Sequence, residues 1–148
     1  MDMESMSGQM ARFTKIIFVG DKYEGEWYQS YKHGEGVDTF TNGDRYTGEY
    51  SFGKFSGKGQ FVWHNGMSYE GDFEAGMRHG QGSWKQNIEG GDQYTGGYVD
   101  DKKHGFGTYQ WTSGNVYKGE FVSDQREGYG EMYWIDGSVY KGMWKSGI

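Results

Sequence analysis

The chain repeats itself at intervals of about 23 residues, and this repeat constrains the fold more than any other feature of the sequence. A motif of the form Tyr-x-Gly-x-aromatic recurs along the chain, beginning at Tyr23, Tyr46, Tyr69, Tyr94, Tyr117 and Tyr140. Successive tyrosines are 23, 23, 25, 23 and 23 residues apart. Because so short a unit has no hydrophobic core of its own, the units must be stabilised by stacking on one another.

The second half of each repeat carries two glycines and then a turn signal. A Gly-x-Gly pair follows each of the first five tyrosines after eleven residues, at Gly34/Gly36, Gly57/Gly59, Gly80/Gly82, Gly105/Gly107 and Gly128/Gly130. Four repeats end in a dipeptide typical of tight hairpin turns, namely Asn42-Gly43, Asn65-Gly66, Ser113-Gly114 and Asp136-Gly137. The third repeat has two extra residues within 86–93, which predicts a longer loop there.

Within a repeat the pattern has a period of two, which predicts β-strands. The Tyr, Gly and aromatic positions of the first strand share one face, while intervening positions such as Glu24 and Glu26 are polar. A single-layer sheet has no second layer to pack on, so its rings must lie across bare glycine backbone. Burying a ring contributes roughly 4–6 kcal/mol at most, against roughly 0.5–1 kcal/mol lost per glycine. The sequence therefore predicts an all-β sheet with one aromatic face and one polar face.

The composition excludes several classes of protein. Aromatic residues make up 19% of the chain, too many for a disordered glycine-rich sequence. The absence of cysteine excludes disulfides and thiolate metal sites, and it favours the cytoplasm. A net charge of -6 argues against nucleic acid as a partner. The longest apolar run, 16–19, is too short to span a membrane, and residues 1–10 lack the pattern of a secretion signal.

From residue 23 to 148 the pattern resembles the MORN (membrane occupation and recognition nexus) repeat, in which Tyr-x-Gly-x-aromatic is followed by Lys/Arg-His-Gly-x-Gly and an Asn/Asp-Gly turn. The resemblance implies successive antiparallel hairpins stacked into an elongated, twisted single-layer sheet with a groove along one side. It predicts an array over 13–148, with repeats at 23–45, 46–68, 69–93, 94–116 and 117–139 and a partial repeat at 140–148. Residues 13–22 resemble half of a degenerate leading repeat, and residues 1–12 are expected to be flexible.

The resemblance also implies a kind of function. MORN arrays occur as stand-alone proteins of cilia, flagella and the cytoskeleton, including radial spoke head components, and as accessory arrays beside kinase or methyltransferase domains. The sequence outside these repeats has no room for a catalytic domain. We therefore expect a non-catalytic scaffold without a cofactor, in the cytoplasm at the cytoskeleton or the axoneme of a cilium.

The candidate binding residues are those that continue the aromatic face along the second strand and into the turn. They are Phe40, Phe61, Trp63, Trp84, Tyr109, Trp111, Met132 and Trp134. Aromatic residues and methionine are enriched in protein interfaces, and a long groove suits an extended peptide or a helix. A protein partner is expected at this face, and which of these side chains are core and which are contact residues stays open.

Membrane targeting is the alternative hypothesis. Basic residues in the loop between the two strands of each repeat would form a rim along one edge of the sheet: Lys32, Lys54, Arg78, Lys102, Lys103 and Arg126. Such a rim could dock on anionic lipid headgroups. Nearby acidic residues, such as Asp100, Asp101 and Asp124, favour ordinary solvated loop charge instead.

Other candidate sites are weaker. Carboxylates two residues apart occur at Glu24/Glu26 and Glu70/Asp72. They are expected on the polar face, where no pocket would shift a pKa for acid–base chemistry. Histidines occupy the same position in three repeats, at His33, His79 and His104, and Ser56 and Glu127 interrupt the row. Capping of the hairpin loop or packing beside the glycines is therefore expected rather than metal binding. The Gly-x-Gly pairs lack the third glycine and the helix of a dinucleotide site.

The last repeat stops after its first strand, within residues 140–148. An unpaired final strand is an exposed sheet edge. Two alternatives stay open: the array continues in a longer chain, or this edge pairs with another chain.

Overall fold

The computed structural model describes residues 11–18 and 20–148, and every regular element in them is a β-strand. The strands are β1 (Ala11–Phe18), β2 (Asp21–Tyr28), β3 (Tyr31–Thr39), β4 (Arg45–Ser51), β5 (Lys54–Val62), β6 (Ser68–Glu74), β7 (Met77–Lys85), β8 (Gln93–Val99), β9 (Lys102–Gln110), β10 (Val116–Val122), β11 (Gln125–Tyr133) and β12 (Val139–Trp144). The chain divides into two compact units, Met1–Met77 and Arg78–Ile148. Most of the predicted flexible segment 1–12 lies outside the described residues.

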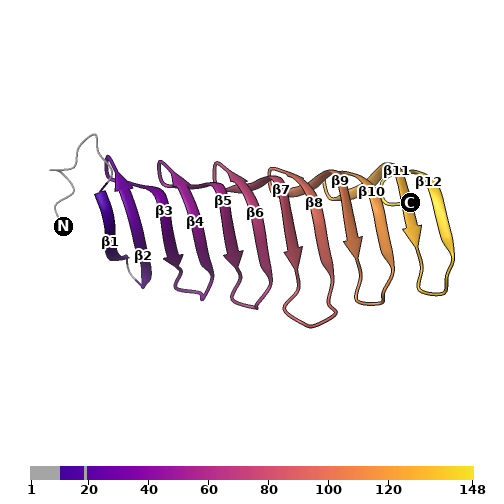
Figure 1. Ribbon diagram of the computed structural model, residues 1–148, viewed down its shortest axis with the longest axis horizontal. Coiled ribbons are helices and arrows are strands. Elements are labelled where there is room, and N and C mark those ends of the chain that lie inside the picture. The colour runs from indigo at the N-terminus through magenta and orange to yellow at the C-terminus, as the bar shows by residue number, and fades with distance from the viewer. Residues whose placement is uncertain (1–10, 19) are drawn as a thin grey trace. The chain divides into compact units, whose positions relative to one another are not determined.

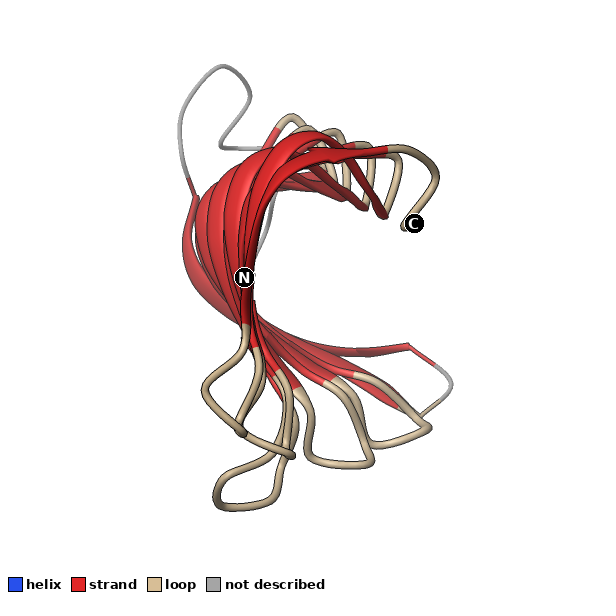
Figure 2. Cartoon of the chain, turned by 90° about the vertical axis from the view of Figure 1, so that its right-hand side faces the viewer, coloured by secondary structure: helices blue, strands red, loops and turns tan. Residues whose placement is uncertain are grey.

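Within each unit the strands follow one another in chain order, and neighbouring strands are antiparallel (Figure 1). β2 and β3 form the hairpin of the first repeat, and β3 then pairs with β4 of the second. In the second unit β8 and β9 form one hairpin, and β10 and β11 form the next. The loops lie at the two ends of the strands (Figure 2). The prediction of an all-β antiparallel sheet of successive hairpins is confirmed.

Two kinds of tight turn connect the strands. Between repeats the predicted turn is formed: Gly43 has a φ of 97°, and the backbone N–H of Asp44 donates to Oδ1 of Asn42 at 2.9 Å. Within a repeat, a two-residue turn places both residues in the left-handed region, as at Asp100 (φ 47°) and Asp101 (φ 70°). Turns of this type match the twist of a β-hairpin. The sequence pattern predicts a loop here but not the turn type, because neither residue is glycine.

The first tyrosine of each full repeat forms the core of the sheet. These side chains are at most 1% exposed: Tyr23, Tyr46, Tyr69, Tyr94 and Tyr117. The rings of Tyr23, Tyr46, Tyr94 and Tyr117 each cover the second glycine of their Gly-x-Gly pair; a Cβ atom on Gly107, for example, would lie 2.5 Å from Cε1 of Tyr94. The Tyr94 hydroxyl donates to the backbone carbonyl of Gly97 at 2.8 Å, and the corresponding bond recurs in other repeats. This hydrogen bond is the physical reason for tyrosine instead of phenylalanine at the position.

Aromatic contacts join each repeat to the next within a unit. In the first unit the ring of Tyr46 meets Tyr50 of its own repeat edge-on at 5.1 Å and Phe73 of the next repeat at 5.2 Å. In the second unit Tyr94 makes the equivalent contact with Phe121 of the next repeat at 5.3 Å. Edge-to-face pairs contribute about 0.5–1.5 kcal/mol each beyond the area they bury. The repeats are therefore stabilised through their neighbours, as expected for a stacked array.

The two glycines of each Gly-x-Gly pair have different roles, which corrects the expectation that both leave room for a ring. Only the second glycine lies under the tyrosine. The first has a positive φ, as at Gly34 (76°) and Gly105 (83°), close to the point where the register of the hairpin shifts. A shift of this kind is a β-bulge, which bends the strand. Figure 2 shows the resulting curvature along the strands.

The first repeat contains a partly buried ion pair where the second repeat has two rings. Asp38 stands in the position of Phe61 and is 1% exposed. Its Oδ2 accepts hydrogen bonds from Nζ of Lys32 at 2.7 Å and from the hydroxyl of Tyr50 at 2.6 Å. Lys32 stands in the position of Phe55, whose ring stacks on the core tyrosine of its own repeat at 3.9 Å. The ion pair and the ring pair thus occupy equivalent space.

Exchanging this pair as a unit should be tolerated. We expect Lys32→Phe alone to lower the free energy of unfolding by about 3 kcal/mol, because it leaves the buried carboxylate of Asp38 without its cation, and Asp38→Phe alone to cost less, because Lys32 is partly exposed. The double variant reproduces the rings of the second repeat and should recover at least about half of that loss. Urea unfolding followed by tryptophan fluorescence measures all three variants. A double variant as unstable as the two single changes added together would refute the equivalence.

Candidate functional site

The predicted contact residues of the first unit lie together on the face that carries the core tyrosines, here called the ring face. The rings of Phe40 and Phe61 are 6.3 Å apart, and those of Phe61 and Trp63 are 4.8 Å apart. All three side chains are partly exposed. Phe55, which was not among the predicted residues, supports them at 5.9 Å from Phe61. The outer rings of this cluster are therefore available to a partner and held from below.

The second unit carries a similar cluster. The rings of Trp84 and Tyr109 are 6.4 Å apart, those of Tyr109 and Trp111 are 4.7 Å apart, and all three side chains are partly exposed. Met132 is only 4% exposed and belongs to the core, whereas Trp134 is 39% exposed. The structure therefore separates buried from exposed side chains among the candidates.

Tyr109 is fixed in the wall of this cluster by Asp92. Its hydroxyl donates to Oδ2 of Asp92 at 2.8 Å, and Oδ1 of Asp92 accepts from the backbone N–H and the hydroxyl of Thr112, both at 2.8 Å. Burial and the neighbouring carboxylate raise the pKa of Tyr109. Burial alone would raise the pKa of Asp92, but hydrogen bonds from Tyr109 and Thr112 lower that pKa overall. Asp92 is thus an ionised acceptor that holds the ring in place near neutral pH.

Four of the six basic residues predicted to form a loop rim lie over rings on the ring face: Lys32, Arg78, Lys103 and Arg126. Nζ of Lys103, for example, lies 5.6 Å from the centre of the Tyr109 ring and 3.3 Å from Oδ1 of Asp124. Lys54 and Lys102 are exposed at the turns. The prediction of a basic rim in the loops is therefore wrong for four of the six residues. Their side chains point to the same face as the tyrosines.

A groove opens on the ring face of the second unit. It is lined by Lys103, Tyr109, Trp111, Phe121, Asp124, Gln125, Arg126 and Gly147. The guanidinium carbon of Arg126 lies 4.7 Å from the centre of the Trp144 ring and 5.8 Å from that of Trp111. Nη2 of Arg126 donates to the carbonyl of Gly147 at 2.7 Å. Among the described residues no carboxylate lies within ion-pair distance of Arg126, so the groove carries a positive charge without an acidic partner.

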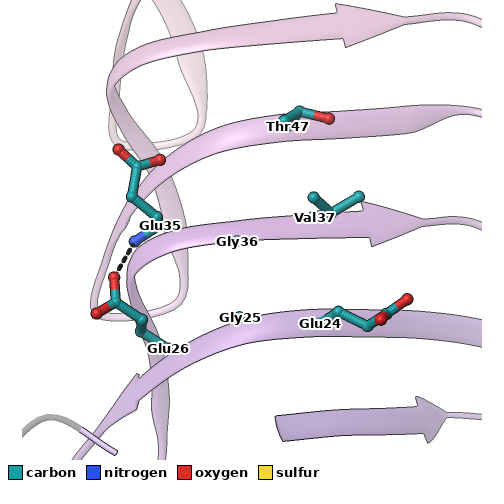
Figure 3. A pocket seen from close by; sticks show the side chains of 7 residues that line it. All are labelled: Glu24, Gly25, Glu26, Glu35, Gly36, Val37 and Thr47. Atoms are coloured by element: carbon teal, nitrogen blue, oxygen red, sulfur yellow. Dashed lines mark hydrogen bonds between the residues drawn. The ribbon is translucent and has the colours of Figure 1, made fainter. Parts of the chain in front are cut away.

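The opposite face, here called the polar face, has a pocket in the first unit (Figure 3). It is lined by Glu24, Gly25, Glu26, Glu35, Gly36, Val37 and Thr47. Figure 3 shows Glu26 and Glu35 on one side of the two glycines, and Glu24, Val37 and Thr47 on the other. Gly25 and Gly36 lie between these two groups of side chains, so backbone forms the floor of the pocket. Apolar side chains also reach this face in the second unit, where Phe106 is 65% exposed and Tyr129 is 47% exposed.

Glu26 is one of a set of carboxylates that hold the backbone at the bulge, a role that the sequence analysis missed. Its Oε1 accepts the backbone N–H of Glu35 at 2.7 Å. Equivalent contacts join Glu49 to the N–H of Lys58 at 2.7 Å and Glu120 to the N–H of Tyr129 at 2.9 Å. The recurrence of glutamate three residues after the core tyrosine was the available signal. Glu26 is therefore a structural acceptor and not half of an acid–base pair.

The histidines at the same position of three repeats, His33, His79 and His104, cap turns, which was one of the two roles expected for them. Each Nδ1 accepts a backbone N–H from the turn of the following repeat, with Phe52 donating to His33 (3.1 Å), Asp100 to His79 (3.4 Å) and Ser123 to His104 (3.4 Å). Glu127 replaces histidine in the fifth repeat and accepts the N–H of Ser146 at 3.0 Å. In the described part of the chain, no group of three His, Cys, Asp or Glu side chains is placed to hold a metal ion. The same residues contain no helix with the length and apolar character needed to cross a membrane.

The repeating hairpin with its tyrosine, glycine pair and turn corresponds to a known family. The profile of the MORN repeat matches residues 23–45, 46–68, 69–90, 94–116 and 117–139. The chain belongs to the MORN-repeat family. Four of these five MORN matches have the bounds predicted from the sequence, and the third ends before the longer loop is complete.

Solved structures similar to this MORN array include the TCP domain of SAS-4 from Drosophila melanogaster, in complex with a proline-rich motif of Ana2. That domain is 11% identical to the array, with a TM-score of 0.47 over 88% of this chain and 78% of the other. So distant a likeness supports no conclusion about function. The comparison with curated protein sequences gives no match. Membership of the MORN family makes the chain a repeat module of a kind that binds proteins or membranes and is generally non-catalytic.

Proposed function

We propose that this chain is a non-catalytic scaffold that binds a segment of another protein on its ring face. The observation that carries the proposal is the set of partly exposed rings above a fully buried layer. Trp134 is 39% exposed, and Trp111 lies 4.7 Å from a Tyr109 ring that Asp92 holds in place. Rigid, half-exposed aromatic side chains are the residues that contribute most to binding energy in protein interfaces.

The charge distribution favours a protein over an anionic membrane as the partner. Lys32, Arg78 and Lys103 all lie within ion-pair distance of an aspartate, at 2.7, 3.1 and 3.3 Å respectively. Attraction to anionic lipid needs several uncompensated basic charges close together. The net charge of -6 opposes it further. The proposal includes a place at the cytoskeleton or axoneme, which rests on the resemblance to stand-alone MORN proteins alone.

A peptide-display library panned against the whole chain tests the proposal. We expect the recovered peptides to bind Trp111→Ala/Trp134→Ala at least about 30-fold more weakly than wild type, because the two rings together should contribute about 2 kcal/mol or more. Isothermal titration calorimetry measures the affinities, and circular dichroism checks the fold of each variant.

The matched control is Phe106→Ala/Tyr129→Ala, which removes two exposed rings from the polar face. We expect it to bind the same peptides with unchanged affinity. Equal losses in the two double variants, or no loss in the first, would overturn the proposal. Anionic vesicles containing phosphatidylserine form a second arm: sedimentation of wild type with them at physiological salt, in the absence of any peptide binding, would favour the membrane alternative.

A further inference from the structure

The candidate contact residues recur at a fixed spacing across the second unit. Trp111 and Trp134 occupy equivalent sites in successive hairpins, where their backbone N–H groups donate to Asn115 and Ser138 respectively, both at 2.9 Å. Equivalent residues of successive hairpins are two strands apart. Strands in a sheet lie about 4.8 Å apart, so equivalent positions recur at about 9.6 Å in a direction that crosses the strands.

Only one regular backbone conformation repeats at this distance. A polyproline II helix has three residues per turn and rises about 3.1 Å per residue, so its side chains face the same way every 9.3 Å or so. An α-helix has a pitch of about 5.4 Å, and neither one turn nor two turns fits. In an extended strand, side chains on one side recur at about 6.7 Å. A segment laid across the hairpins therefore keeps register with the tryptophans only in the polyproline II form.

The side chains of the groove suit such a segment chemically. Aromatic-lined grooves bind proline-rich segments because the bound conformation is already formed in the free peptide. Nζ of Lys103 has a carboxylate of Asp124 at 3.3 Å. Arg126 contacts the rings of Trp111 and Trp144, and no carboxylate of the described residues lies within ion-pair distance of it; Asp124, which lines the same groove, pairs with Lys103. The positive charge of Arg126 would be complemented by an acidic residue of the partner.

We propose that the partner is a proline-rich segment with an acidic residue, bound as a polyproline II helix across the hairpins of the second unit at three residues per repeat. The acidic residue lies beside Arg126, and every third side chain meets the site marked by Trp111 or Trp134. This inference rests on the proposed function and names the chemistry of its partner.

Three synthetic nine-residue peptides test the inference by calorimetry on the whole chain. The first has leucine at positions one, four and seven, aspartate at position six and proline elsewhere. The second has the same composition with leucine at positions one, three and five. The third keeps the leucines and the aspartate of the first but replaces every proline with alanine. We expect the first peptide to bind at least about 10-fold more tightly than either of the others, because it alone presents a preformed face with the period of the hairpins.

The role of Arg126 is tested by changing the peptide and the protein in turn. Changing the aspartate of the first peptide to asparagine should weaken its binding to wild type several-fold, and Arg126→Gln should remove this difference between the two peptides. The peptide change leaves the protein intact, so it stays informative if the variant is unstable. Trp134→Ala should weaken the first peptide, and Phe106→Ala should not.

The outcomes separate this inference from the proposed function. Equal or tighter binding of the second peptide would contradict the three-residue period and favour an extended strand, in which every second side chain faces the same way. Tighter binding of the third peptide would favour a helix, because alanine replaces its prolines. Failure of all three peptides, while library peptides still depend on Trp111 and Trp134, would overturn the polyproline II inference and leave the scaffold intact. Library peptides that ignore both tryptophans would remove the proposed function itself.

Discussion

Adding one methyl group at Gly107 is expected to lower the free energy of unfolding by about 3 kcal/mol or more. The new Cβ atom would lie 2.5 Å from Cε1 and 2.6 Å from Cζ of Tyr94, far inside van der Waals contact. The ring cannot retreat, because it is 1% exposed, packs against Tyr98 and Phe121, and is tied through its hydroxyl to the carbonyl of Gly97 at 2.8 Å. Gly107→Ala therefore strains the layer that joins two repeats.

Gly90→Ala is the matched control for this change. Gly90 lies in the longer loop of the third repeat with a φ of 75°, and a Cβ atom there would meet nothing within 4 Å. Its expected cost is about 1 kcal/mol, from the backbone conformation alone. Urea unfolding of both variants, followed by near-ultraviolet circular dichroism, compares them directly. Equal stabilities would mean that the tyrosine layer yields easily, contrary to the packing described.

Removal of a core tyrosine is the second change with a large expected effect. Tyr46→Ala should lower the free energy of unfolding by about 3–5 kcal/mol, because it empties a fully buried site. The ring of Tyr46 stacks on Phe55 at 3.9 Å and meets Phe73 of the next repeat at 5.2 Å. Tyr46→Phe keeps these contacts and loses the hydrogen bonds of the hydroxyl, among them the 2.6 Å bond to the carbonyl of Glu49, which should cost about 1 kcal/mol.

Thermal and urea unfolding measure the stability of both tyrosine variants, and hydrogen exchange shows which strands lose protection. We expect faster exchange in β4 and also in β6, because Phe73 loses its partner. Tyr31→Ala is the control, since Tyr31 is 51% exposed and its loss should change stability by about 0.5 kcal/mol or less. Loss of protection confined to β4 would argue against coupling between repeats.

The architecture could be predicted from sequence because its two main signals are local. The interval between tyrosines gives the repeat, and a period of two together with the Asn-Gly turns gives the hairpins. Tyr94 and Gly107 could be matched as ring and bare backbone because both lie at fixed places in the pattern. The pattern does not give the register in which neighbouring strands pair. The bulge at the first glycine shifts the pairing, so the role of Gly105 appears only in three dimensions, and the recurring glutamates such as Glu120 could be noticed in the sequence without their bonding partners.

The candidate site was predictable in part for the same reason. Trp63 and Trp111 are partly exposed and follow β5 and β9, whereas the core tyrosines of the same repeats lie on β4 and β8. The difference between Met132 at 4% and Trp134 at 39% exposure depends on which neighbouring ring covers each one. The positions of Lys32 and Arg126 over the rings depend on the bulge as well, so these residues were assigned to a rim.

The layer of tyrosines has a consequence for how such a chain can change in length. Within the units, four core tyrosines cover a glycine of their own repeat and meet a ring of the next, so these junctions share the same aromatic contact: Tyr23, Tyr46, Tyr94 and Tyr117. Excising residues 46–68 as a block would bring Phe73 to the place that Tyr50 holds beside Tyr23, where the rings are 5.3 Å apart. Copies of 23 residues are thus interchangeable links. Duplication or loss of one repeat would change the length of the partner segment that the protein can bind, and it would leave the contacts within the core of the remaining repeats unchanged.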